Sequence, residues 1–402
     1  MGNKVHHRRI EADERRARLG VRHRLAGAAR AASAEEVAGA LVALHATDPA
    51  SVFLAVGARL GGQPGIAGPV AGLERALYED RTLTRMHGMR HTLFVFPTAL
   101  VPTVHASTTR DVATRERATL LKDLAKGSEY DGAWLAETER QVLAELAVRG
   151  EATGSELGEA VPRLRAQYVY GVGTRQEGPQ SLSSRLLRVL GMEGRIARGR
   201  PQGAWTSSRF RWAPTPEQPD PSDEFAHADL VRQWLAACGP ATEADLKWWT
   251  GWKVTDVRKA LAAIGAEPVE LAEGTGHVLP DDLDPVPVGD ADLEPWAALL
   301  PALDPTAMGW QYRDWYTDPA HKAALFDRSG NIGPTVWWNG RVVGGWAQRP
   351  DGEIALRFLS DDGGSEARAA VEAEAARLSG WVGDVRVTPR FRTPLERELS
   401  GG

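Results

Sequence analysis

Cysteine is almost absent from this chain, and so are the long hydrophobic runs that cross a membrane. Cys238 is the only cysteine among 402 residues, which excludes an internal disulfide and a zinc site built from cysteines. No run approaches the ~18 apolar residues that a membrane-spanning helix needs. The first twenty residues are charged and contain no apolar segment typical of a secretory signal. We therefore expect a cytoplasmic protein with no membrane partner.

The sequence also lacks the short motifs that hold common cofactors. It contains no phosphate-binding P-loop, no glycine fingerprint of a dinucleotide-binding fold, no metal-ligand spacing and no nucleophile elbow. We therefore expect neither a cofactor nor a metal. The composition is that of a globular protein, with 43% hydrophobic and 25% charged residues. The length indicates roughly two to four domains.

Lysine is missing from the most basic part of the chain. Residues 161–213 contain ten arginines and two glutamates, although the whole chain carries a net charge of −5. Such a cluster in an otherwise acidic protein is typical of a face that binds a polyanion, and the forked guanidinium suits phosphate oxygens. A solvated charged surface is the alternative. The candidates for contacts to a nucleic-acid backbone are Arg185, Arg188, Arg198, Arg200, Arg209 and Arg211.

A polar turn interrupts two apolar helices near the N-terminus, where residues 44–49 read LHATDP. Ser33 and Glu36 have the spacing of a capping box that begins the first helix. Asp48 is placed to cap the next helix, with Pro49 at its first position. The sequence therefore predicts helix–turn–helix spacing with the residues HAT in the turn. A histidine there either satisfies the backbone or handles a proton.

Alternating apolar residues in 81–96 predict a hairpin after these helices, and helices followed by a hairpin are typical of a winged helix. The same order of helices, glycine stops and short strand-like runs recurs further along the chain. We therefore predict three tandem winged helix–turn–helix units, in 1–130, 131–215 and 216–285. The first carries the HAT turn, and the second is the basic one.

The pattern changes in the last predicted domain, 286–402. Residues 334–360 read as two or three strands joined by Asn-Gly and Asp-Gly turns, a strong hairpin signal. Residues 367–382 predict one helix, and 384–389 a last strand. The expected domain is small, β-rich and barrel-like. The whole chain is then an α+β protein, which we expect to be a monomer.

Three segments carry a resemblance to a known family: LVALHATDPASVFLAVGARL, GPATEADLKWWTG and LLPALDPTAMGWQYRDWY with the following LFDRSGNIGPTVWWNGRVVGGWAQR. They resemble the AlkZ/YcaQ-type family of bacterial DNA glycosylases, whose members are often described simply as winged-helix DNA-binding proteins. The tryptophan-rich segments are specific. The resemblance runs over most of the chain, from about residue 20 to about residue 395.

The resemblance implies a catalytic turn in the first unit. The family places Gln-x-Gln or Gln-x-Asp there, and the matching triplet here is His45-Ala46-Thr47. It also implies double-stranded DNA with alkylated bases as the partner, and bulky N7-alkylguanine adducts of natural-product genotoxins as substrates. Members are often self-resistance proteins. The replacement of glutamine by histidine leaves a proton acceptor in place, although it departs from the family motif.

The chemistry of such a substrate fits these side chains. An N7-alkylated guanine is cationic, so its glycosidic bond is already weak and the enzyme has to stabilise an oxocarbenium ion and deliver water. Neutral His45 can accept the proton of that water, and the hydroxyl of Thr47 can hold it. Asp48 could add negative charge beside the cation, although a helix cap is its simpler role. If His45 is the proton acceptor, its protonation should reduce activity as the pH drops through the histidine pKa, near ~6.5.

Three further residues, His87, Arg90 and His91, are candidates for the same cleft. His87 and His91 precede the strand TLFVF and either line the cleft or only belong to the hairpin. Arg90 between them is a candidate phosphate or substrate contact. No lysine lies near the HAT turn, so a Schiff-base lyase step is not expected. The alternatives to a monofunctional glycosylase are a non-catalytic winged-helix regulator and a protein that sequesters a small genotoxin.

Overall fold

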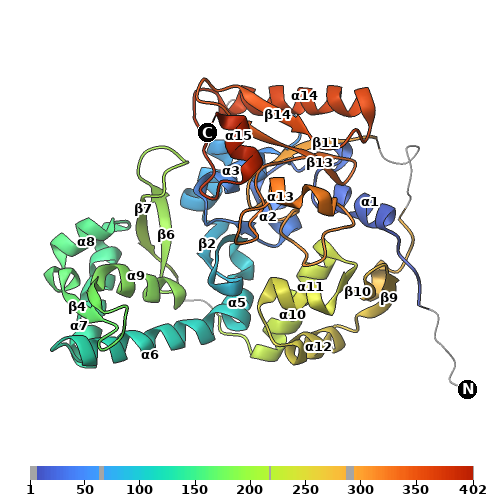
Figure 1. Ribbon diagram of the computed structural model, residues 1–402. Coiled ribbons are helices and arrows are strands. Elements are labelled where there is room, and N and C mark those ends of the chain that lie inside the picture. The colour runs from blue at the N-terminus through green and yellow to red at the C-terminus, as the bar shows by residue number, and fades with distance from the viewer. Residues whose placement is uncertain (1–6, 63–67, 217–218, 287–293, 402) are drawn as a thin grey trace, which may run out of the picture.

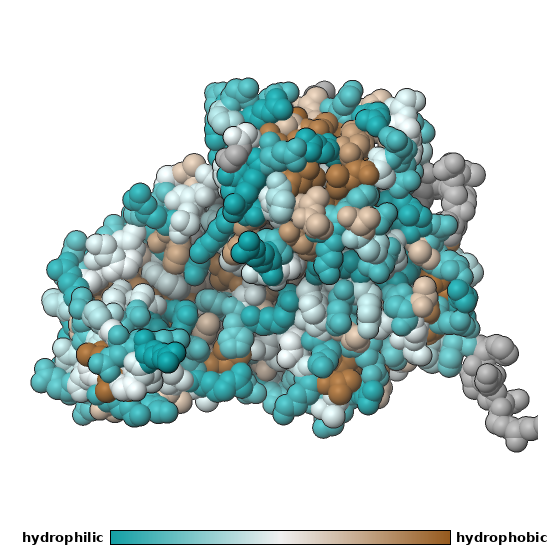
Figure 2. Space-filling view, viewed as in Figure 1, coloured by the Kyte–Doolittle hydropathy of each residue, from teal (hydrophilic) through white to brown (hydrophobic). Residues whose placement is uncertain are grey.

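The computed structural model describes residues 7–62, 68–216, 219–286 and 294–401. Helices alternate with small antiparallel sheets (Figure 1), so the predicted α+β class is confirmed. No helix in the described ranges is long and apolar enough to cross a membrane. In the space-filling view the surface is mainly hydrophilic, and hydrophobic residues are visible between hydrophilic ones over the C-terminal region (Figure 2).

The first unit contains the expected helices and hairpin. Ser33 accepts a hydrogen bond from the backbone N–H of Glu36, which starts the first of these helices. The elements are α2 (Ala34–Leu41), β1 (Leu44–His45), α3 (Pro49–Gly57), α4 (Gly68–Glu74) with η2 (Arg75–Glu79), β2 (Leu83–His87) and β3 (Leu93–Pro97). The short strand β1 pairs with β3, so the sheet order is β1-β3-β2. The HAT turn is thereby built into the sheet edge.

The third unit repeats this order. Its elements are α10 (Asp223–Cys238), β8 (Ala241–Thr242), α11 (Glu243–Thr250), α12 (Val254–Ala263), β9 (Glu267–Leu271) and β10 (Gly274–Val278). The sheet order β8-β10-β9 matches that of the first unit, because the short strand between the first two helices again pairs with the second strand of the hairpin. The two units therefore share one topology without close sequence identity.

The second unit has the same order with one insertion. Its elements are α7 (Gly132–Arg149), α8 (Gly154–Ala160), α9 (Leu182–Met192), β6 (Ile196–Pro201) and β7 (Phe210–Pro214). A bridge between Ala152 and Trp212 takes the place of the short strand. The extra hairpin of β4 (Gln167–Tyr170) and β5 (Gly178–Ser181) was not predicted. The long helix α6 (Arg110–Gly127) carries this unit to one side of the molecule (Figure 1).

The C-terminal region is an open sheet rather than a barrel. The strands β11 (Ala297–Leu300), β12 (Thr335–Trp338), β13 (Arg341–Gln348) and β14 (Ile354–Phe358) pair in chain order. No pairing of β11 with β14 closes this sheet within the described ranges. The Asn-Gly turn is confirmed, since Asn339 and Gly340 both have positive φ angles.

Two helices accompany this sheet, α14 (Gly364–Val382) and α15 (Pro394–Ser400). The strand predicted for 384–389 is not formed, so that prediction was wrong. The side chain of Gln348 instead accepts a hydrogen bond from the N–H of Val387 and donates one to the carbonyl of Val385. These bonds satisfy the segment without a sheet ladder.

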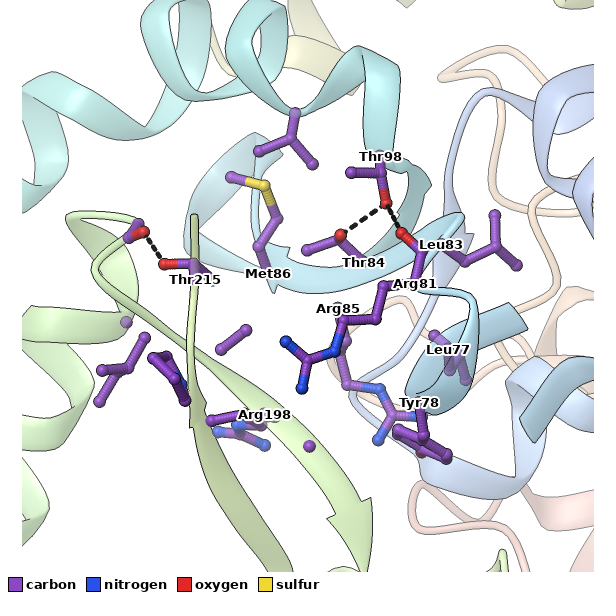
Figure 3. Close-up of a pocket in the computed structure, with 18 of the residues that line it drawn as sticks. Leu77, Tyr78, Arg81, Leu83, Thr84, Arg85, Met86, Thr98, Arg198 and Thr215 are labelled. Carbon is purple, nitrogen blue, oxygen red and sulfur yellow. Dashed lines mark hydrogen bonds between the residues drawn. The ribbon is translucent and has the colours of Figure 1, made fainter. Parts of the chain in front are cut away.

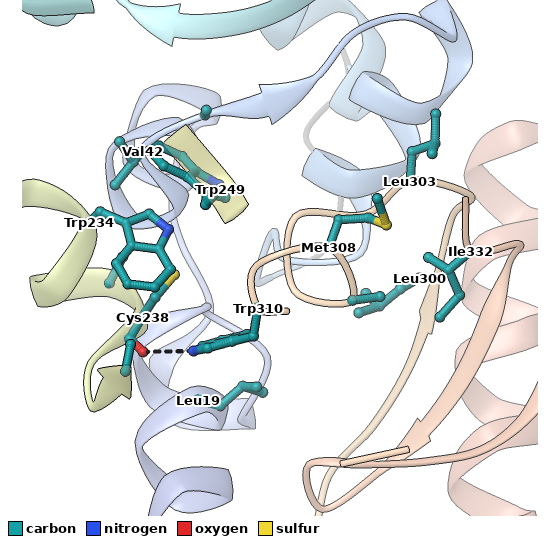
Figure 4. Close-up of a cluster of buried hydrophobic side chains, with 14 of the residues drawn as sticks. Leu19, Val42, Trp234, Cys238, Trp249, Leu300, Leu303, Met308, Trp310 and Ile332 are labelled. Carbon is teal, nitrogen blue, oxygen red and sulfur yellow. Dashed lines mark hydrogen bonds between the residues drawn. The ribbon is translucent and has the colours of Figure 1, made fainter. Parts of the chain in front are cut away.

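The hydrophobic core joins regions that are far apart in the sequence. One buried cluster combines the start of the chain with the third unit and the C-terminal region, and Figure 4 shows Leu19, Trp234, Trp310 and Ile332 within it. A second cluster joins the first unit to the C-terminal sheet. The second unit has a core of its own. The first unit, the third unit and the C-terminal sheet therefore form one packed body, beside which the second unit stands.

The second unit touches that body again at the tip of its hairpin. Trp205, between β6 and β7, is 7% exposed. Its ring centroid lies 5.1 Å from that of Phe53 on α3 and 6.3 Å from that of Trp381 on α14. The hairpin tip therefore fastens the second unit to the body, in addition to α6 and to the pairing of Arg200 on β6 with Glu74 and Glu79 of the first unit.

Candidate active site

The HAT turn is held by backbone pairing to β3. His45 is opposite Phe94 in the ladder, and the N–H of Ala46 donates to the carbonyl of Leu93 at 2.8 Å. The half-buried His45 ring packs edge-on against the Phe94 ring, with centroids 5.1 Å apart. Within the described residues neither ring nitrogen makes a hydrogen bond, and Nδ1 is buried. His45 is thus fixed in place while its polar atoms stay uncommitted.

The surroundings of His45 keep it neutral. Burial, and then the positive charge of Arg90, lower the pKa of His45 to about 4. At neutral pH the imidazole can therefore accept a hydrogen bond or a proton from water. No carboxylate bonded to Nδ1 raises its basicity, in contrast with a catalytic triad. His45 is best suited to holding a water and taking its proton late, as the new C–O bond forms.

Asp48 has the structural role that the sequence favoured. It is the N-cap of α3, and its Oδ1 accepts from the N–H of Ala50 at 3.1 Å. Its Oδ2 accepts from the N–H of Arg390 at 2.9 Å. Burial raises the pKa of Asp48, while these two bonds and the Arg390 charge act against that effect. Both oxygens are engaged, so the carboxylate ties the HAT turn to the C-terminal segment.

Thr47 lies between these two residues. It is half-buried, and its hydroxyl makes no hydrogen bond within the described part of the chain. The guanidinium of Arg390 approaches the carbonyl of Thr47 at 3.4 Å. The Thr47 hydroxyl is accordingly available to a water or a substrate atom, as the sequence interpretation requires. Arg390 was not found from the sequence, since nothing local to it signals this long-range contact.

The structure does not bring the two hairpin histidines to His45. His87 is opposite Leu93 in the ladder, one register position from the pair of His45 and Phe94. Neighbouring positions face opposite sides of a sheet, so His87 and His45 lie on different faces. Burial, and then Arg198, Arg188 and His91, lower the pKa of His87 to about 4. His87 therefore faces the second unit.

The turn of the hairpin carries the remaining two candidates. Arg90 and His91 are both exposed and both have positive φ, 52° and 58°. Non-glycine residues pay for this conformation with strain. The Arg90 guanidinium lies 4.2 Å from the centre of the Trp248 ring of the third unit. Of the three hairpin candidates His87, Arg90 and His91, Arg90 is the one whose charge lowers the pKa of His45.

The arginines of the basic segment are largely neutralised by carboxylates of other elements. Arg185 and Arg188 share Glu116, Arg200 approaches Glu74 and Glu79, and Arg211 approaches Glu156; these ion pairs span 2.7–3.5 Å. Exposed pairs of this kind are weak, so a phosphate can replace the carboxylate. A charge count along the sequence could not show these pairings.

Two of the six arginines differ from the others. Arg209 is exposed and has no ion pair among the described residues. Arg198 lies 4.1 Å from the Phe210 ring centre and also lacks a carboxylate partner. Burial, followed by the charges of Arg85 and Arg390, lowers the pKa of Arg198 to about 10. Arg85 was not singled out in the sequence, although a charged residue inside a strand is a recognisable signal.

The next question is whether the described residues could bind a metal ion. The described residues contain no group of three or more His, Cys, Asp or Glu side chains arranged to hold a metal ion. Cys238 is buried, and burial raises the pKa of its thiol. The side chains available for chemistry at the HAT turn are therefore the imidazole, the Thr47 hydroxyl and the nearby guanidinium groups.

Comparison with known proteins identifies the fold and the family. The fold matches that of the Streptomyces sahachiroi DNA glycosylase AlkZ, with a TM-score of 0.65, 20% sequence identity, and coverage of 96% of this chain and 100% of that one. A search of curated proteins finds no match. The family model for AlkZ-like DNA glycosylases matches residues 38–381. The class is therefore that of hydrolases acting on N-glycosyl bonds. The chain belongs to the AlkZ-like DNA glycosylase family.

Proposed function

We propose that the protein is a monofunctional DNA glycosylase that hydrolyses the N-glycosidic bond of bulky N7-alkylguanine adducts in double-stranded DNA. The observation that carries this proposal is the neutral imidazole of His45, which the sheet fixes and which makes no hydrogen bond among the described residues, at the turn where the family resemblance implies catalysis. A role in self-resistance to a genotoxin and a monomeric state belong to the same proposal.

In the proposed reaction His45 and Thr47 hold one water beside C1′ of the damaged nucleotide. The bond between C1′ and N9 breaks, and its electron pair goes to the base and neutralises the N7-alkylated ring. The water oxygen then bonds to C1′, and its proton passes to the free imidazole nitrogen of His45. Since the leaving base is already cationic, no general acid is required.

The three repeated units support the DNA-binding part of the proposal. We infer that each is a winged helix, because each combines helices with a hairpin whose second strand pairs with the segment between the first two helices. Arg90, Arg198 and Arg209 are the candidate phosphate contacts without a carboxylate partner in the described part of the chain. Arg185, Arg188, Arg200 and Arg211 would exchange a carboxylate for a phosphate.

The test is direct detection of the released base. The protein, in excess, is incubated with duplex DNA that carries a bulky N7-guanine adduct, and the supernatant is analysed by mass spectrometry for the free adducted base. Spontaneous depurination is measured on the same duplex without protein and subtracted. Tight, sequence-selective duplex binding without release of any base would favour the alternative of a winged-helix regulator.

A further inference from the structure

A cavity of about 130 Å³ lies between the first and second units, beside the hairpin of β6 and β7 (Figure 3). Much of its wall is apolar, and includes Leu77, Met86 and Ile196. Arg85 lines the cavity from β2 on one side, and Arg198 lines it from β6 on the other (Figure 3). The cavity is partly open to solvent.

The two arginines lack the partners that buried cations require. Arg85 is 6% exposed, and its Nε and Nη2 are buried without a hydrogen bond. The Nε of Arg198 is in the same state, and neither residue forms an ion pair within the described ranges. An unpaired buried charge costs several kcal/mol. Arg59 shows the ordinary solution, since Asp304 binds it through two bonds of 2.6 and 2.9 Å.

The other polar groups of the cavity do not supply the missing anion. Arg81 adds a third positive charge to the wall. Among the described residues of the wall, Glu151 is the one carboxylate, and it makes no ion pair with either arginine. The hydroxyl of Thr98 donates to the carbonyl of Arg81 at 2.7 Å and shares a bond with Thr84. The wall therefore carries three guanidinium groups against one carboxylate.

We propose that this cavity is a phosphate-binding site in which Arg85 and Arg198 hold one phosphodiester of the bound DNA strand. Two planar guanidinium forks match the tetrahedral oxygens of a phosphate, and the volume admits one such group with a few waters. That the phosphate belongs to DNA rests on the proposed function. The phosphate chemistry itself rests on the two unpaired arginines.

The position of the site relative to His45 defines its role. Arg85 is opposite Val95, which is opposite Leu44. These residues occupy the face of the sheet opposite to His45 and Phe94. The site therefore lies one register position from His45 and on the other face of the sheet. A DNA phosphate bound there would be close to the HAT turn without touching the reacting atoms. Arg85 and Arg198 are binding residues, and their loss should weaken DNA binding more than it slows base release in a saturated complex.

The first experiment compares Arg85→Gln with the parent protein in stability and in binding of an undamaged duplex. Removal of an unneutralised buried charge should raise the melting temperature of the free protein, whereas removal of a phosphate contact should lower duplex affinity. The slope of log K against log salt should become shallower by about one. Arg85→Lys, which keeps the charge and loses the fork, should restore the slope but only part of the affinity.

A matched control removes a positive charge elsewhere. Arg328 is exposed and unpaired in the described structure of the C-terminal region, so Arg328→Gln should leave the affinity and the salt slope close to those of the parent protein. A lower melting temperature for Arg85→Gln, with unchanged duplex binding and salt slope, would make Arg85 a structural residue and overturn the proposal. A gain in stability with weaker duplex binding supports it.

The second experiment identifies the source of the phosphate. Inorganic phosphate, added at constant ionic strength, should raise the melting temperature of the parent protein and not that of Arg85→Gln. Stabilisation by phosphate with an unchanged duplex salt slope would assign the site to a free phosphate and overturn the DNA contact. All these measurements use undamaged duplex. A protein that binds as expected but releases no base therefore contradicts only the proposed glycosylase activity.

Discussion

The first and third units have the same topology, but they differ in hydrogen bonding at the end of the short strand that precedes the second helix. His45 is the second residue of the short strand β1, and Thr242 is the second residue of β8. Thr242 caps α11 through a capping box with Asp245. The other oxygen of Asp245 accepts from the N–H groups of Gln311 and Tyr312 at 2.8 and 3.1 Å. Every side-chain oxygen of Thr242 and Asp245 has a hydrogen-bond partner.

In the first unit the equivalent junction leaves polar atoms without partners. The helix cap has moved to Asp48, three residues after His45, and the turn between them exposes an imidazole and a hydroxyl to whatever docks there. The comparison shows that one scaffold can either satisfy the polar groups of this junction or leave them without partners. The junction with a complete set of hydrogen bonds fixes the third unit, and the incomplete one is the place where a ligand can bind.

The largest effect is expected from substitution of His45, at the first-unit junction between β1 and α3. His45→Ala should lower single-turnover base release by about 10³-fold, within the range for positioned proton acceptors. His45→Gln should keep most of the activity if hydrogen bonding to the water is what matters, because an amide can also hold the water. Rates are measured with enzyme in excess. Full activity of His45→Ala, with its fold intact by circular dichroism, removes the imidazole from the mechanism.

The second prediction concerns Asp245, at the third-unit junction between β8 and α11. Asp245→Ala leaves the N–H groups of Thr242, Gln311 and Tyr312 without an acceptor, and should lower the free energy of unfolding by about 3 kcal/mol. Denaturant unfolding measures this loss. At a temperature where the variant is folded, its base release should match that of the parent protein. A slower rate there would mean that the third unit positions the substrate.

The third prediction concerns the hydroxyl of the reactive junction. Thr47→Ala should slow base release by up to about 10²-fold if the hydroxyl positions water. Thr47→Ser, which keeps the hydroxyl and removes the methyl group, is the matched control and should stay close to the parent rate. Equal activity of all three proteins would leave His45 as the sole side chain that holds the water.

The smallest effect is expected from pH. The sequence predicted a loss of activity near ~6.5, the ordinary histidine value, but burial and Arg90 place the pKa of His45 at about 4. Base release should therefore stay flat from pH 7 to about 5 and fall only as pH approaches 4. A falling limb near 6.5 in the parent protein, absent from His45→Gln, would show that bound DNA raises the pKa instead.

Three histidines with lowered pKa values link stability to acid: His45, His87 and His23, which is buried at the end of α1 (Ala12–Arg22). The pKa values of His23, His45 and His87 are lowered to about 3, 4 and 4 in the folded protein. The unfolded chain therefore binds more protons below pH ~6.5, and stability is lost as pH falls from there toward the folded values. Each histidine contributes about 1.4 kcal/mol per pH unit in that window, so the rate profile is to be read only where the protein is folded.

Much of the fold could be predicted because its signals are local. Caps such as Ser33 and Asp48, glycine stops and the Asn339-Gly340 turn act within a few residues. The errors concern long-range pairing. β11 becomes a strand only because β12, 35 residues further on, lies beside it, and 384–389 is extended but pairs with a glutamine side chain. Alternating hydrophobicity does not distinguish these outcomes.

The candidate site could be predicted only in part. The role of His45 followed from the family resemblance, whereas its ring packing and its lowered pKa depend on Phe94 and Arg90, which are distant in sequence. His87 was grouped with it because proximity along the chain does not reveal the face of a sheet. The charge of the basic segment was overestimated, since Arg188 meets its partner Glu116 only after α6 and α9 have packed together.

The docking of Trp205 at the hairpin tip has a kinetic consequence. Any movement that separates the hairpin tip of the second unit from the body must withdraw this indole from Phe53 and Trp381. Exposure of a buried tryptophan of ~200 Å² costs about 5 kcal/mol. The undocked form then accounts for only about one molecule in several thousand. A duplex that needs this opening would enter slowly and, once enclosed, would leave more slowly than its contacts alone imply.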